Sequence, residues 1–206
     1  MTIDAKDLLN SILASVARID YVKPEDIPNI ELYMDQVTRF MDEHLAASKR
    51  HDDDKVLTKT MINNYAKNNL LPPPVKKKYS KEHVLHLIFI YYFKNLISIK
   101  DIETLMDPIT KKYFQNEKTG ELNLTDIYEE VFELESLRID ETSKDIAKSY
   151  THAMNTFKDL PEEEREYLQL FAFICSLSFD VYVKKMIIEK LIDQLPEPEH
   201  DKKKRK

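Results

Sequence analysis

The sequence predicts an all-α fold, and three observations lead to that prediction. The 206 residues include a single glycine, Gly120, whereas phosphate-binding loops and dinucleotide-binding turns need backbone positions that only glycine can occupy, and a β-sandwich with tight turns is unlikely with so little glycine. The chain is rich in Leu, Ile, Lys and Glu, which favour or tolerate helices. Apolar residues recur at helical spacing in several segments. We therefore expect helices joined by short loops, in one or two domains.

The first elements follow from apolar spacing and from the positions of prolines. Residues 2–17 predict a short amphipathic helix, which two prolines within residues 20–28 bring to an end. A second helix is expected over residues 29–46, followed by a polar connector at residues 48–55 with Asp52, Asp53 and Asp54. Residues 1–26 thus form an N-terminal helix with its connector.

The later elements are marked by residues that start helices. Ser80 begins one helix, and Ser98 begins another with Asp101 three residues on, the spacing of a capping box. Residues 115–124 hold the only glycine and are the best candidate for a domain boundary. Further helices are expected over residues 125–139, 142–157 and 161–195, the last being compatible with one helix or two. Residues 27–108 and 121–195 are the two main regions, and residues 196–206 a disordered tail.

Several classes of protein are not indicated. No nucleophile, base and orienting group occur in a recognisable arrangement, so we expect neither an enzyme nor a cofactor. His83 and His86 lack a nearby cysteine, which favours a surface or half-buried role over metal binding.

Cys175 lies in an apolar run and is expected to be buried and inert, in a reducing compartment. No signal sequence is recognised, and the longest apolar run, residues 168–179, is too short for a bilayer. We expect a cytoplasmic protein without membrane contact.

Charge is distributed unevenly along the chain. The formal net charge is -6, yet residues 55–81 carry seven lysines and no acid, which leaves 24 basic against 37 acidic residues elsewhere. A basic segment in an acidic protein predicts contact with a polyanion such as nucleic acid. The alternative is an ordinary solvated face.

Helical periodicity divides this basic segment into two sides. Met61, Ile62, Tyr65 and Ala66 fall on one side of a helix, and the other side carries uncharged hydrogen-bonding groups and a lysine: Thr60, Asn63, Asn64 and Lys67. Asparagine can bond bidentately to the edge of adenine, so this face is suited to reading a major groove. An exposed face with no partner is the alternative, and the residues leave both open.

A proline-rich stretch follows. Residues 70–80 read LLPPPVKKKYS, in which three prolines forbid a helix and favour an extended segment. The segment would present Lys76, Lys77 and Lys78 to a phosphate backbone as a wing. A rigid, soluble connector is the alternative.

These residues resemble a known family. The string LTKTMINNYAKNNLLPPP at residues 57–74, with KKKYSKEHV at 76–84, is similar to an uncharacterised bacterial family that carries a domain of unknown function and is considered MerR-like. The resemblance covers residues 27–106. It implies the winged helix-turn-helix of MerR-type regulators and therefore double-stranded DNA as the partner. With the helix face and the lysine segment described above, the expected DNA contacts are Lys59, Thr60, Asn63, Asn64, Tyr65, Lys67, Lys76, Lys77, Lys78 and Tyr79.

The sequence departs from the MerR pattern at several places. Asn63 stands where arginine is usual, and Asn69 stands where glycine is usual, although asparagine tolerates the left-handed conformation of a helix end. The connector at residues 48–55 is longer than a tight turn, and its three aspartates would repel phosphate. No long heptad run follows Met106, so the coiled-coil arm of MerR-type dimers is not evident.

The sequence as a whole predicts a DNA-binding transcriptional regulator. We expect a homodimer through the apolar C-terminal helices, residues 168–195. An effector pocket of Phe171, Phe173, Phe179 and Tyr182 is the alternative to plain packing. The rival to the whole interpretation is a helical protein-interaction module without DNA affinity. One continuous positive surface would favour the regulator, and an exposed apolar groove the module.

Overall fold

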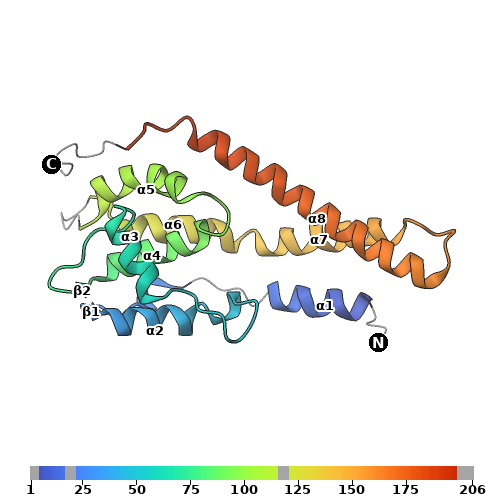
Figure 1. Cartoon of the computed structure of the whole chain (residues 1–206), viewed down its shortest axis with the longest axis horizontal. Coiled ribbons are helices and arrows are strands. Elements are labelled where there is room, and N and C mark those ends of the chain that lie inside the picture. Colours follow the sequence, from blue (N-terminus) through green and yellow to red (C-terminus); the bar gives the residue numbers. More distant parts are fainter. Residues whose placement is uncertain (1–4, 17–21, 116–120, 199–206) are drawn as a thin grey trace. The chain divides into compact units, whose positions relative to one another are not determined.

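A computed structural model describes residues 5–16, 22–115 and 121–198. By internal contacts the chain forms two compact units. The first, which we call the central unit, comprises Val22–Val131 with Ile188–Lys206; the second, the hairpin unit, comprises Met1–Tyr21 and Phe132–Ile187. The described residues are mostly helical, which confirms the predicted all-α class (Figure 1).

The central unit contains short and long helices and a pair of two-residue strands. Its elements are, in chain order, the 3-10 helix η1 (Pro24–Asp26), β1 (Leu32–Tyr33), α2 (Met34–His44), the 3-10 helix η2 (Ala46–Ser48), α3 (Lys59–Lys67), β2 (Lys78–Tyr79), α4 (Lys81–Phe93), α5 (Ile99–Tyr113) and the first part of α6 (Leu124–Ser136). The strands pair antiparallel, with Leu32 opposite Tyr79 and Tyr33 opposite Lys78. Figure 1 shows β2 reached from α3 by a long loop.

Helix α4 is the core of the central unit. Every residue from His83 to Tyr91 is buried, as expected for a helix that is surrounded by other elements. Tyr128 of α6 is also fully buried, and its hydroxyl donates to the carbonyl of Val22 at 2.6 Å. The predicted capping box at the start of α5 is confirmed, because Ser98 Oγ accepts from Asp101 N at 3.1 Å and Asp101 Oδ2 accepts from Ser98 N at 3.1 Å.

The hairpin unit is built from α1 (Ala5–Val16), α7 (Ile139–Met154) and α8 (Glu162–Ile192), which is one continuous helix. Its core consists of buried Leu9, Ala153 and Phe173. Gln169 ties α8 to the end of α7, since its amide donates to the carbonyls of Met154 and Thr156, each at 2.9 Å. No helix of residues 5–16, 22–115 and 121–198 is both long and apolar enough to cross a membrane.

Two expectations about side chains were wrong. Cys175 is exposed, because Phe173 turns to the core and a residue two positions further lies about 200° around the helix. His83 and His86 are buried, because α4 is enclosed on all sides rather than on one. Of the four aromatic side chains for which packing and an effector pocket are the alternatives, Phe173 packs edge-on against Tyr150, with ring centroids 5.4 Å apart, and Phe171, Phe179 and Tyr182 are exposed.

Candidate nucleic-acid interface

Helix α3 has the two faces that its periodicity predicts. It begins after Thr58, whose hydroxyl oxygen accepts from Met61 N at 3.2 Å and so caps the helix. Ile62 and Tyr65 are buried against the core. Four side chains lie exposed on the opposite side: Thr60, Asn63, Asn64 and Lys67. This face therefore presents uncharged donors and acceptors and one cation to solvent.

Asn63 and Asn64 are available for external hydrogen bonds. Within the part of the chain that the structure describes, neither side-chain amide bonds to another protein group, and the main-chain carbonyl of Asn64 accepts from Asn68. Asparagine is a weak helix former, and helix propensity alone does not explain two of them in succession. Their free amides can donate and accept at once, as pairing with the edge of adenine requires.

The end of α3 directs the chain toward the strands. Asn69 has a φ of 58°, so it supplies the left-handed residue expected of it at the helix end. Leu70 N donates to Tyr65 O at 2.9 Å, which is the six-to-one bond of a Schellman motif. Leu70 and Leu71 then return to the core, where both are buried, and the three prolines follow.

The three lysines do not form an extended segment, contrary to expectation. Lys78 N donates to Val75 O at 2.9 Å, and the two residues between them are left-handed, with φ of 51° for Lys76 and 64° for Lys77. Two successive left-handed residues make a type I′ turn, which normally carries Asn-Gly. The predicted extended conformation is not observed because Lys78 and Tyr79 pair with β1. Only a tight turn brings Val75 opposite Lys78. We call residues 75–78 the lysine turn.

Ion pairs separate the lysines of the basic segment into two groups. Lys59 forms an ion pair with Asp35, and Lys78 Nζ lies 3.2 Å from Glu31 Oε2. Lys67, Lys76 and Lys77 have no acidic partner among the described residues. Lys55 and Lys81 also form no ion pair among the described residues. Unpaired positive charge therefore includes the C-terminal end of α3 and the tip of the lysine turn, while Asp35 and Glu31 neutralise Lys59 and Lys78.

Tyr65 and Tyr79 belong to the core rather than to the exposed face. Their exposed fractions are 7% and 2%, and burial raises the pKa of both phenols. Neither ring is accessible to DNA in this structure. Tyr79 packs edge-on against His83, with ring centroids 5.6 Å apart, so it anchors β2 to α4.

Two buried histidines support the segment between α3 and α4. His86 Nε2 donates to Leu70 O at 2.9 Å, and His83 Nδ1 accepts from Ser80 N at 3.0 Å. Burial lowers the pKa of His86 to about 4 and also lowers that of His83. The two rings hold both ends of residues 70–80. The sequence signal that we missed is their position in a helix whose other residues from 84 to 90 are all apolar.

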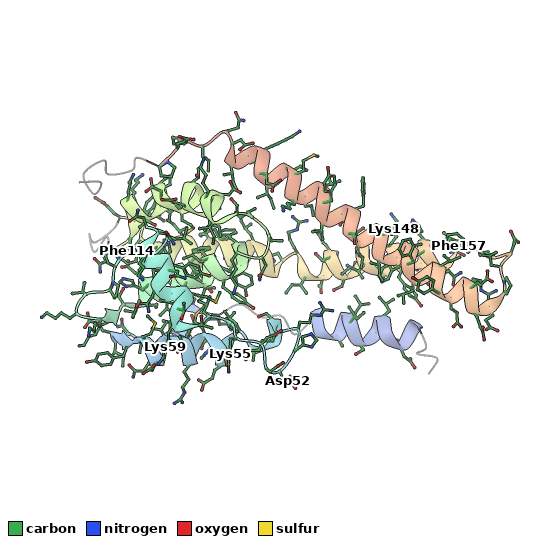
Figure 2. All side chains as sticks on the ribbon, in the orientation of Figure 1. Asp52, Lys55, Lys59, Phe114, Lys148 and Phe157 are labelled. Carbon is green, nitrogen blue, oxygen red and sulfur yellow. The ribbon has the colours of Figure 1, made fainter. Side chains whose placement is uncertain are left out.

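The connector before α3 is folded against the core. Val56 and Leu57 are buried, and Lys94 Nζ donates to Val56 O at 2.8 Å. Asp42 holds the connector from the other side by accepting from Lys49 Nζ at 3.0 Å, and this hydrogen bond lowers the pKa of Asp42. Asp52 projects from the bend of the connector, with Lys55 between it and Lys59 (Figure 2).

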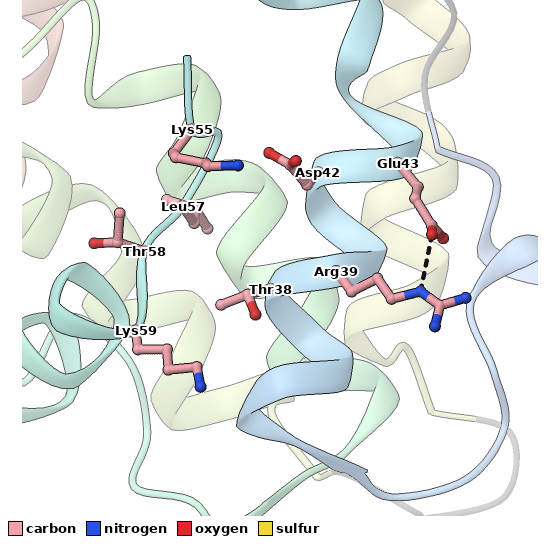
Figure 3. Close-up of a pocket in the computed structure, with 8 residues that line it drawn as sticks. All are labelled: Thr38, Arg39, Asp42, Glu43, Lys55, Leu57, Thr58 and Lys59. Carbon is pink, nitrogen blue, oxygen red and sulfur yellow. Dashed lines mark hydrogen bonds and ion pairs between the residues drawn. The ribbon is translucent and has the colours of Figure 1, made fainter. Parts of the chain in front are cut away.

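A hollow of about 450 Å³ lies between α2 and the residues that enter α3 (Figure 3). It is lined by charges of both signs and a few uncharged groups: Thr38, Arg39, Asp42, Glu43, Lys55, Leu57, Thr58 and Lys59. Arg39 Nε bonds to Glu43 Oε1 at 2.9 Å, so its charge is already matched. Among the described residues no cluster of three or more His, Cys, Asp or Glu side chains is placed to hold a metal ion.

The fold and the exposed residues define a helical domain in which two helices are followed by a tight hairpin turn. A family model described as domain of unknown function (DUF1836) matches residues 22–131, and the chain belongs to this family. The matched residues coincide with the continuous part of the central unit. Comparison with curated proteins found no match, and comparison with solved structures found none either.

Proposed function

We propose that the central unit is a MerR-like winged helix-turn-helix that binds double-stranded DNA in a transcriptional regulator. In this proposal α3 is the recognition helix and the lysine turn is the wing. The observation that carries it has two parts. Lys76 and Lys77, both left-handed and without an acidic partner among the described residues, lie at the tip of the lysine turn, and the preceding helix α3 carries Asn63 and Asn64 with free amides on its exposed face. No catalytic step is part of the proposed function.

The conformation of the lysine turn supports the proposal. A non-glycine residue in the left-handed region costs about 1 kcal/mol or more, and Asn-Gly would form the same turn without that cost. The chain instead holds two lysines there, at φ of 51° and 64°. Strain at a charged tip is typical of a site that contacts a ligand. Phosphate is the ligand that two adjacent, unpaired lysines fit.

Each residue of the proposed surface has a separate role. Thr60, Asn63 and Asn64 contact base edges, and Lys67 contacts a phosphate or a guanine. Lys76 and Lys77 contact the backbone. Lys59 and Lys78 position α3 and the turn through Asp35 and Glu31, so their contribution to binding is smaller. Tyr65 and Tyr79 are left out of the surface because they are buried.

A protein-interaction module without DNA affinity is the second candidate. The observation in its favour is the exposed apolar surface of α8, where Phe171 and Tyr182 are more than half exposed. Such surface is typical of protein interfaces. It lies on a different unit from α3, so an interface there is compatible with DNA binding by the central unit.

Titration of the full chain into a short, fluorescent, random-sequence duplex tests the proposal. We expect saturable anisotropy changes with a dissociation constant between about 10⁻⁴ and 10⁻⁶ M at physiological salt, which is typical of non-specific binding. Selection from a random duplex library is then expected to yield a preferred sequence. No binding even at low salt would contradict the proposal and favour the interaction module.

A further inference from the structure

The small sheet of the central unit has one face in the core and the other in solvent. Leu32 and Tyr79 lie opposite each other across the strands and are buried, with exposed fractions of 4% and 2%. Because successive side chains of a strand point to opposite faces, Tyr33 and Lys78 point outward. Tyr33 is 55% exposed. An aromatic ring therefore lies on the surface immediately before α2.

The lysine turn adds an apolar side chain to this outer face. Val75 lies opposite Lys78 across the turn, and directly opposed residues of an antiparallel pair share one face. Tyr33, Lys78 and Val75 therefore form a row, which we call the sheet face. The ammonium of Lys78 lies 5.8 Å from the centroid of the Tyr33 ring and 3.2 Å from Glu31 Oε2. The charge of Lys78 is matched by Glu31, and its aliphatic stem continues the apolar row.

The sheet face concentrates the exposed apolar surface of the family domain. Among the described residues of 22–131, the large apolar side chains with the three highest exposed fractions are Ile30, Tyr33 and Val75, at 65%, 55% and 54%. Two of them belong to the sheet face, and Ile30 lies just before β1. Apolar residues that are exposed singly are normal, whereas a group of them marks a contact site.

Unpaired positive charge adjoins the sheet face. Lys76 and Lys77 directly follow Val75 in the chain and have no acidic partner among the described residues. Glu31 reaches the same face, but its carboxylate is neutralised by Lys78. The result is an apolar strip with free cations at one end. A DNA strand has the complementary surface, because sugar rings with apolar carbons alternate with charged phosphates along its backbone.

We propose that the sheet face packs against the deoxyribose rings of the DNA strand whose phosphates bind Lys76 and Lys77. The inference rests on the DNA binding proposed above and adds to it an apolar contact through Tyr33 and Val75. A second copy of the chain does not fit as the occupant, because its own unpaired lysines would meet these. The contact carries no charge, so it strengthens binding without releasing counterions.

The salt dependence of duplex binding separates this contact from the ionic ones. Tyr33→Ser is compared with the wild-type full chain by anisotropy over a range of salt concentrations. We expect binding to be weaker on the order of five-fold at every salt concentration, with an unchanged slope, because an apolar contact is lost and no phosphate contact is. Residue 33 is the N-cap of α2, where serine is a favoured residue, so the helix content should be unchanged in circular dichroism.

Two variants control for the loss of the ring. Tyr33→Phe retains the ring and should bind like the wild type. Tyr167→Ser removes a tyrosine that is 69% exposed in the hairpin unit, and it should also bind like the wild type. Wild-type affinity for Tyr33→Ser would overturn the inference, and so would a decrease in its salt slope, which would show that the ring acts only by positioning lysines.

A tryptophan reporter tests the contact directly. The chain contains no tryptophan, so Tyr33→Trp introduces a single emitter that can be excited selectively. We expect duplex DNA to change the emission of this residue and to protect it from quenching by acrylamide. Tyr167→Trp is the matched control, whose accessibility to acrylamide should be the same with and without DNA.

Anisotropy of a fluorescent duplex, recorded with the same two variants, shows whether DNA is bound. Binding without any change in the emission or the accessibility of residue 33 would overturn the sheet-face contact and leave the proposed DNA binding intact. The absence of binding at low salt would overturn both. Protection at residue 33 and not at residue 167 is the result that the inference predicts.

Discussion

At the scale of single residues, Lys76 and Lys77 combine a backbone cost with a charge that nothing in the described chain neutralises. Both have positive φ, and lysine gains nothing from that conformation, unlike asparagine or glycine. The stability of the fold therefore does not explain why lysine occupies these two positions. A contact with an anion does explain it. The same reasoning does not extend to Lys78, whose ammonium group already pairs with Glu31.

Replacing Lys76→Asn together with Lys77→Gly separates stability from binding. The variant should be more stable by about 1 to 2 kcal/mol, because Asn-Gly suits a type I′ turn, yet it should bind duplex DNA more weakly. Chemical denaturation and anisotropy measure the two effects. Lys76→Gln with Lys77→Gln is the control, which removes the charges without relieving the backbone. A more stable variant that binds like wild type would remove the turn from the interface.

His86 makes the stability of the chain dependent on pH. Its pKa falls from 6.5 to about 4 in the folded state because it is buried, so the unfolded chain takes up a proton first as the pH decreases. The contribution of neutral His86 to the free energy of unfolding is fully present above pH 6.5. As the pH falls from 6.5 to about 4 this contribution is lost, and the free energy of unfolding decreases by about 3 kcal/mol. The lowered pKa of His83 acts in the same direction.

Urea denaturation at a series of pH values measures this effect. His86→Gln retains a donor for Leu70 O but does not titrate, so its stability should vary less over the same range. Asp42 does not interfere with the comparison of wild type and His86→Gln. The pKa of its carboxyl group is lowered from 3.8, so its contribution to stability is lost only at lower pH. Equal pH dependence in wild type and His86→Gln would show that His86 is not the group responsible.

At the scale of elements, α3 is the part of the interface that carries sequence specificity in the proposed function. Asn63 and Asn64 are exposed and uncharged. Changing either to Ala should therefore cost about 1 to 3 kcal/mol at a selected site and leave non-specific binding nearly unchanged. The stability of the chain should not decrease, since Ala is the better helix former.

Binding of both variants to the selected and to a scrambled duplex provides the measurement. Thr151→Ala, another exposed helical polar residue outside the central unit, is a matched control. If both Ala variants bind the selected site as wild type does, α3 is not the recognition helix.

Some elements could be predicted from the sequence because they depend on neighbouring residues alone. The exposed face of α3, the Ser98 capping box and the left-handed Asn69 all follow from interactions within a few positions. The lysine turn could not be predicted, because its geometry depends on β1, and the ion pair beside it joins residues 47 positions apart. The burial of His86 and the exposure of Cys175 likewise depend on which helix faces are covered, and local spacing does not determine that.

At the scale of the whole molecule, two properties are assigned to two compact units. The family domain at residues 22–131 carries the proposed DNA surface, and the hairpin unit carries the exposed apolar side chains of α8, such as Phe171 and Tyr182. The chain is acidic overall, with a formal net charge of -6, so it should be repelled by DNA except where cations are unpaired. Binding should therefore depend strongly on salt and on only a few lysines.

The slope of the logarithm of the binding constant against the logarithm of salt concentration tests DNA binding most directly. We expect a clear negative slope for the wild type. In the variant with Lys76, Lys77 and Lys78 all changed to Gln, the magnitude of the slope should decrease by about 0.9 for each phosphate that the protein no longer neutralises. Lys78→Gln alone should change it little, because Lys78 is paired with Glu31. A wild type that does not bind, or a triple variant with an unchanged slope, would contradict the proposed interface.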